Sequence, residues 1–63
     1  MTRAELHEYF LGRAIDDLQR AEYDVRRHRN AGAPEEFIQL AEKHRKLCIK
    51  KLMKVVDLGE KYL

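Results

Sequence analysis

The sequence predicts an all-α protein in which two long helices pack as an antiparallel hairpin. Apolar residues recur at spacings of three and four along both halves of the chain, which is the period of an amphipathic helix. Asn30, Gly32 and Pro34 are gathered at one break near the middle. The 63 residues include only 3 Gly and 1 Pro, too few for a turn-rich β protein.

The first helix is expected over residues 3–30. Thr2 is a suitable N-cap, and Glu5 three residues later completes the pattern of a capping box. Leu11 and Ile15 widen the apolar stripe of this helix on one side. The stripe itself has helical spacing throughout and consists of Leu6, Phe10, Ala14, Leu18, Ala21 and Val25.

The chain is expected to turn over residues 30–34 and to form a second helix over residues 34–61. Asn30 or Gly32 can end the first helix in the left-handed conformation, and Pro34 suits the first turn of the next helix. Gly59 can fray the end of that helix. Its stripe, again at threes and fours, consists of Phe37, Leu40, Ala41, His44, Leu47, Cys48, Leu52, Val55, Leu58 and Tyr62, with Ile38, Ile49 and Val56 at one flank.

A connection of about five residues between two long helices favours an antiparallel hairpin, so residues 1–63 are expected to form one domain. Opposing residues then have numbers that sum to roughly 65. This register places apolar residues opposite each other along most of the hairpin. The expected neighbours are Val25 with Leu40, Ala21 with His44, Leu18 with Leu47 or Cys48, Ala14 with Leu52, Leu11 with Val55, and Leu6 with Leu58.

The apolar stripes are wider than a single pair of helices needs. One seam uses about two apolar residues in seven on each helix, whereas the second helix is apolar over about half of its circumference. The chain has 1 Cys and therefore no internal disulfide to compensate for a small core. We expect two copies to form a four-helix bundle with two-fold symmetry, although a different protein could cover the same flank. The residues that a lone hairpin would leave largely wet, and that we assign to this interface, are Leu11, Ile15, Ile38, Ile49 and Val56.

Charge is distributed unevenly despite a net charge of only +2. Residues 43–54 contain six Lys or Arg and no acid, and four of these lysines recur at helical spacing as an exposed stripe. A second basic group lies close to the turn. Such surfaces bind acidic proteins, nucleic-acid phosphates or anionic membranes. The candidate partner-binding residues are Lys43, Lys46, Lys50 and Lys54 of the stripe and Arg26, Arg27 and Arg29 of the turn cluster.

Residues that could carry chemistry are few. His44 and Cys48 share one helical face at a spacing that metal ligands use, but two ligands do not make a site, and Cys48 is better explained as a small core residue. The acidic pair Asp16 and Asp17 points about 100° apart on a helix and cannot share a proton. No glycine-rich phosphate loop or Glu-x-x-His motif occurs. We therefore expect no enzyme activity, metal or cofactor.

These observations favour a small regulatory or adaptor protein of a bacterial or phage cytoplasm that binds a macromolecular partner, with a protein as the first candidate. No apolar run approaches the roughly 20 residues that span a bilayer, and the first residues lack the apolar region of a signal peptide. The alternative function is RNA or DNA binding by a helical bundle through the basic stripe. The two differ in salt dependence, because phosphate contacts weaken steeply as salt rises.

Overall fold

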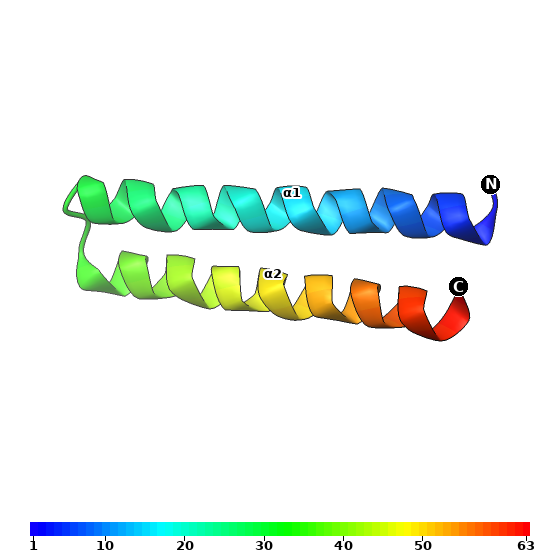
Figure 1. The fold of residues 1–63 in the computed structure, drawn as a ribbon. Helices are drawn as coiled ribbons and strands as arrows, with labels where there is room; N and C mark the ends of the chain where they lie inside the picture. Colours follow the sequence, from blue (N-terminus) through cyan, green and yellow to red (C-terminus); the bar gives the residue numbers. More distant parts are fainter.

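The computed structural model describes residues 1–63 and consists of two α-helices that lie side by side (Figure 1). Helix α1 spans Arg3–Asn30 and helix α2 spans Glu35–Tyr62. The helices are antiparallel, so both termini lie at one end, called here the open end, opposite the turn. The Cα atoms form a rod of 45 × 16 × 12 Å. The all-α hairpin is confirmed, and the ends of both helices lie within one residue of the predicted ones.

Helix α1 begins at the predicted capping box. The backbone N–H of Glu5 donates to Thr2 Oγ1 at 3.1 Å, and the backbone N–H of Thr2 donates to Glu5 Oε1 at 3.2 Å. These bonds satisfy two backbone donors that have no partner within the helix. The helix therefore starts where the local sequence specifies it.

Helix α1 ends at a glycine turn. Gly32 has a φ of 66°, the left-handed conformation that glycine adopts without steric cost. Its N–H donates to the carbonyl of Arg29 at 3.2 Å, and the N–H of Ala33 donates to the carbonyl of His28 at 3.0 Å. This pair of bonds is the Schellman motif, and it identifies Gly32 rather than Asn30 as the left-handed residue.

Helix α2 begins one residue later than predicted. Pro34 has φ −54° and ψ 144°, so its ring imposes a helical φ while its ψ is still extended. Pro34 is consequently the N-cap of α2 rather than part of its first turn. Glu35 and Glu36 follow in that turn, where the positive end of the helix dipole favours acidic side chains.

The helices meet along a seam at which residues of reduced exposure alternate at spacings of three and four. Because the helices are antiparallel, each seam residue of α1 lies opposite a residue of α2, and the two residue numbers sum to 66. His7 and Gly59, which approach each other closely, are one such pair. The regular alternation is that of coiled-coil core positions. The seam residues are His7, Leu11, Ala14, Leu18, Ala21, Val25 and His28 on α1, and Ile38, Ala41, Arg45, Cys48, Leu52, Val55 and Gly59 on α2.

The seam corrects part of the predicted register. Ala41 and Arg45 take the places opposite Val25 and Ala21 that were predicted for Leu40 and His44. A shift of one residue rotates a helix face by about 100°, so Leu40 turns outward and is 62% exposed.

The same seam changes the expectation for two residues of the assigned oligomer interface. Leu11 and Ile38 lie on the seam and are half-buried, so the hairpin itself covers much of both side chains. The expectation that a lone hairpin would leave Leu11 and Ile38 largely wet is therefore wrong. The reason is the register: the seam runs through these two positions rather than beside them.

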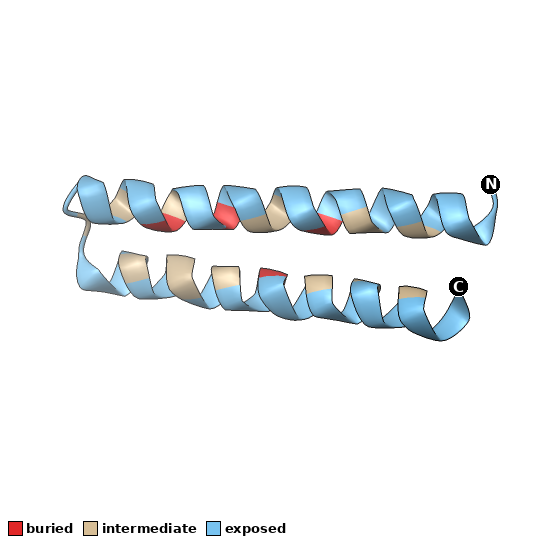
Figure 2. Cartoon of the chain, in the orientation of Figure 1, coloured by how far each residue is buried: buried red, intermediate tan, exposed pale blue.

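The core of the hairpin is thin. Only 4 of 63 residues are buried, namely Ala14, Ala21, Val25 and Cys48, and no large side chain is fully buried. Figure 2 shows the buried residues on the sides of the helices that face each other. Ala14 and Ala21 are each 1% exposed, and such small side chains let the two backbones approach closely.

Close packing at the open end explains Gly59. The Nε2 of His7 donates to the carbonyl oxygen of Val55 across the seam at 2.9 Å, so the proton resides on Nε2. A Cβ built on Gly59 would collide with the His7 imidazole. Gly59 therefore does not fray α2, which continues to Tyr62, but makes room for the histidine.

We expect Gly59→Ala to leave the free energy of unfolding at or below that of the wild type. Alanine is favoured over glycine by about 1 kcal/mol within a helix, but here its Cβ displaces the His7 imidazole. In a His7→Ala background the same substitution should raise the midpoint of thermal unfolding. Melting of the four proteins at one concentration, followed by circular dichroism, makes the comparison. Equal stabilisation in both backgrounds would contradict the close approach.

Candidate functional site

Two ion pairs between the helices mark the two flanks of the hairpin. On the first flank, Arg29 of α1 pairs with Glu42 of α2. On the second flank, Asp17 of α1 pairs with Lys51 of α2 at 3.7 Å. Arg29 and Glu42 each follow a seam residue, whereas Asp17 and Lys51 each precede one, so the two pairs lie on opposite sides of the seam. Residues seven apart share a helix face, so the residues at heptad spacing from each ion pair belong to the same flank.

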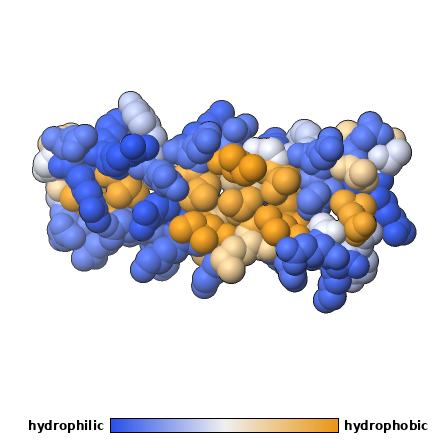
Figure 3. All heavy atoms as spheres, viewed as in Figure 1, coloured by the Kyte–Doolittle hydropathy of each residue, from blue (hydrophilic) through white to orange (hydrophobic).

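The first flank carries an apolar patch. Ile15 lies two heptads before Arg29, and Ile49 and Val56 lie one and two heptads after Glu42. These three side chains are 40%, 36% and 41% exposed, so the hairpin covers more than half of each and leaves the rest accessible. Figure 3 shows an apolar patch over the middle of both helices, with mainly hydrophilic side chains and smaller apolar groups toward each end. The exposed side chains of the first-flank patch are Ile15, Ile49, Met53 and Val56.

The second flank is hollowed near the open end. Phe10 lies one heptad before Asp17, and Leu58 lies one heptad after Lys51. Between them is a groove of about 580 Å³ that both helices line. Sequence reasoning assigned Leu6, Phe10 and Leu58 to the core and therefore missed this groove. In the structure they line it as exposed side chains.

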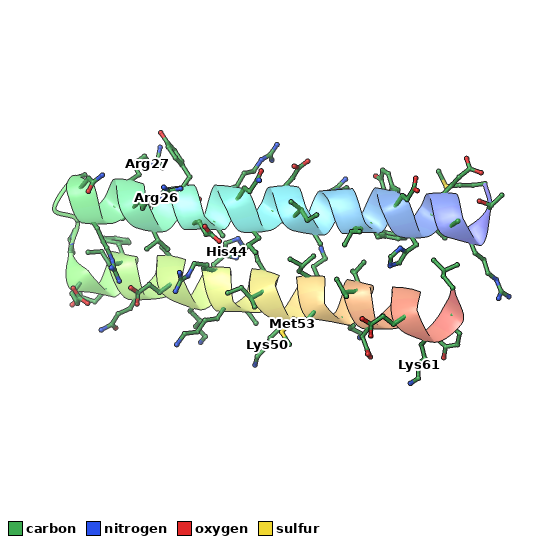
Figure 4. All side chains as sticks on the ribbon, in the orientation of Figure 1. Arg26, Arg27, His44, Lys50, Met53 and Lys61 are labelled. Atoms are coloured by element: carbon green, nitrogen blue, oxygen red, sulfur yellow. The ribbon has the colours of Figure 1, made fainter.

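The four predicted stripe lysines, Lys43, Lys46, Lys50 and Lys54, are all exposed. None of them forms an ion pair, because the ion pairs of the chain involve Asp24 with Arg27, Arg29 with Glu42, and Asp17 with Lys51. Lys50 points away from α1 at the outer edge of α2 (Figure 4). The stripe is therefore a row of uncompensated positive charges on the outer side of α2.

The predicted arginine cluster is divided. Arg27 pairs with Asp24 at 3.9 Å, and Arg29 pairs with Glu42 across the seam, while Arg26 makes no ion pair. Arg26 and Arg27 lie on α1, away from Lys50 on the far edge of α2 (Figure 4). Arg26 and Arg27 therefore do not form one basic surface with Lys50.

The histidine and cysteine side chains that could act as metal ligands or nucleophiles do not form a common site. Cys48 is buried on the seam, and its Sγ lies 3.8 Å from the Nε2 of His44, which is exposed on the same helix. No group of three His, Cys, Asp or Glu side chains is arranged to hold a metal ion. His28 donates from Nδ1 to the carbonyl of Asp24 at 2.7 Å. The position of Cys48 is that expected of a small core residue.

Arg45 is a seam residue that sequence reasoning did not single out. It is half-buried opposite Ala21, and its Nε is buried without a hydrogen-bond partner. An unpaired buried donor costs about 1–3 kcal/mol. Ile38, Ala41, Arg45 and Cys48 follow one another at spacings of three and four, so this spacing could have identified Arg45 as a seam residue. The sequence analysis assigned His44 to the apolar stripe instead.

Tyr9 organises its neighbours at the open end. Its ring packs edge-on against Phe10, with centroids 5.5 Å apart and an interplanar angle of 72°. Its hydroxyl accepts a hydrogen bond from Nη1 of Arg13 at 3.3 Å, and this bond raises the pKa of Arg13 above its ordinary value.

No family model matches the chain, and comparison with curated proteins and with solved structures finds no similar protein. Neither α1 nor α2 includes a stretch apolar enough to span a lipid bilayer. The surfaces just described, namely the first-flank patch, the groove and the lysine stripe, are the features on which a function can be argued.

We expect the midpoint of thermal unfolding to be the same with added zinc and with a chelator, because Cys48 and His44 have no third ligand beside them. Cys48→Ser should lower the midpoint, since it replaces a buried thiol on the seam with a more polar hydroxyl, at a cost of about 1–3 kcal/mol. Differential scanning calorimetry measures both effects. A zinc-dependent rise that disappears in Cys48→Ser would show that the pair does bind metal.

Proposed function

We propose that this protein is a non-enzymatic adaptor or regulator that self-associates into a four-helix bundle and binds a second protein through its charged surface. The observation that carries the proposal is the combination of a thin core, with 4 of 63 residues buried, and an exposed apolar patch on one flank. A chain of this size without disulfides gains little stability from so small a core. A second copy would supply the missing buried area.

The first flank suits contact with a second copy. A two-fold axis through the patch would place Ile15, Ile49 and Val56 of one chain against the same residues of the other, which is the geometry of an isologous interface. Glu22 lies one heptad from Ile15, and Lys46 lies one heptad from Met53. The charges around the patch are therefore of both signs, so two copies do not repel each other across it.

Lys43, Lys50 and Lys54 of the lysine stripe remain accessible in such a dimer because they lie outside the first flank, whereas Lys46 borders the patch. The stripe lysines have no acidic partner within the chain and attract an acidic surface. A protein partner is favoured over an enzyme substrate because most of the reactive side chains are engaged or covered, and the exposed His44 has only Cys48 beside it. His7 and His28 donate to backbone carbonyls, and Cys48 is buried.

We expect sedimentation equilibrium at micromolar concentration to show two chains for the wild type and one for Val56→Glu. The added carboxylates would face each other and the apolar patch across the two-fold axis, where charge is strongly disfavoured. Lys43→Glu on the outer side of α2 is the matched control, and it should remain a dimer. A wild-type monomer at these concentrations would rule out the proposed self-association.

The uncompensated stripe also supports the alternative function of RNA or DNA binding. This function predicts a mobility shift at low salt that weakens linearly on a logarithmic salt scale, with a slope of about −0.7 to −0.9 per phosphate contact. Lys43→Glu combined with Lys50→Glu should abolish it. The proposed protein-binding function predicts no shift of RNA or DNA at low salt, so one gel experiment separates the two.

A further inference from the structure

The groove on the second flank has a mainly apolar floor built from both helices. It lies at the open end of the hairpin and has a volume of about 580 Å³. The Phe10 ring makes an edge-on contact with Tyr9. The apolar floor residues are Leu6, Phe10, Val55, Leu58, Tyr62 and Leu63.

The rim of the groove is positively charged. Arg3, Lys51 and Lys54 line it, and no Asp or Glu does. Asp17 compensates Lys51 at 3.7 Å, while Arg3 and Lys54 form no ion pair. The groove thus combines an apolar floor with uncompensated positive charge, whereas the first-flank patch has charges of both signs around it.

This charge argues against a second copy as the occupant. A two-fold axis through the groove would bring Arg3 and Lys54 of one chain close to the same cations of the other, and like charges across an interface are strongly disfavoured. A nucleic-acid backbone would satisfy the rim but leave the apolar floor uncovered. An occupant that matches both features has an apolar face and acidic side chains beside it.

A groove between two helices is suited to a third helix. Two antiparallel helices form a groove along their length into which a third helix packs at about 8–10 Å from each. Partner helices recognised in this way present apolar side chains at positions i, i+3, i+4 and i+7. Phe10 of α1 and Leu58 of α2 both line the groove and offer apolar contact surfaces for such a row.

We infer that the groove binds an acidic amphipathic helix of a partner protein, with its apolar face on Phe10 and Leu58 and its carboxylates near Arg3 and Lys54. The inference rests on the proposed protein-binding function and specifies the chemistry of the partner. It places partner recognition at the open end of the second flank and leaves the first flank for the second copy.

The test uses the full chain and a fluorescein-labelled peptide of about 18 residues, which is about 27 Å as a helix. The peptide has leucines at i, i+3, i+4 and i+7 and glutamates on the remaining faces. We expect fluorescence anisotropy to show binding to the wild type that Leu58→Glu weakens by at least about tenfold. Lys54→Glu should also weaken it and reduce its salt dependence, because that variant alters the rim alone.

Two control peptides address non-specific attraction. A scrambled peptide of the same composition keeps the charge but loses the apolar face, and a peptide with lysine in place of glutamate keeps the face but reverses the charge. Both should bind at least about tenfold more weakly. Equal binding of either peptide, or an unchanged affinity of Leu58→Glu, would overturn the inference.

Variants on the two flanks separate this inference from the proposed self-association. Val56→Glu should be monomeric and still bind the peptide, whereas Leu58→Glu should remain dimeric and lose it. Loss of the dimer in Leu58→Glu would instead identify the groove as the self-interface and overturn the inference. Leu58-dependent binding of RNA or anionic vesicles, without peptide binding, would also overturn it. Phe10→Ser provides a second floor variant if circular dichroism shows that Leu58→Glu does not fold.

Discussion

The packing of α1 against α2 along one narrow seam is the constraint on which the rest of the structure depends. Ala14 and Ala21 are small enough to let the backbones approach, and Gly59 leaves space for the His7 imidazole at the open end. Close approach has a consequence for burial, because small residues remove little apolar area from water. The seam therefore orders two long helices without fully covering the larger apolar side chains on either side of it.

The two flanks that result differ in charge, and this difference organises the proposed function. The first-flank patch is apolar at its centre with charges of both signs around it, which suits a second copy of the chain. The groove on the second flank has a cationic rim without an acid, which suits a partner of opposite charge. Because the flanks lie on opposite sides of the seam, one hairpin can use both at once.

The seam also contains a polar residue, Arg45, that lacks a hydrogen-bond partner for one buried nitrogen. Arg45 lies opposite Ala21 with its Nε unpaired. Polar groups at coiled-coil core positions are known to select register and oligomeric state at a cost in stability. Arg45 therefore disfavours registers that would bury its guanidinium more deeply, and it weakens the hairpin relative to an apolar residue at the same place.

Local sequence was sufficient to predict both helices and their ends. The capping box at Thr2 and the left-handed glycine at Gly32 act within a few residues of themselves, so they can be read without knowledge of the fold. The partial exposure of Ile15, Ile49 and Val56 was also predictable, since stripes wider than one seam must leave some apolar residues partly uncovered.

Only the tertiary structure decided which residues meet. A register shift of one residue is enough to exchange Leu40 for Ala41 on the seam, and the pattern of apolar residues fits either choice almost equally well. The actual register depends on backbone approach at the small seam residues, which is a property of both helices together. The groove on the second flank follows from that register. The sequence by itself therefore determined the elements, and packing determined the surfaces.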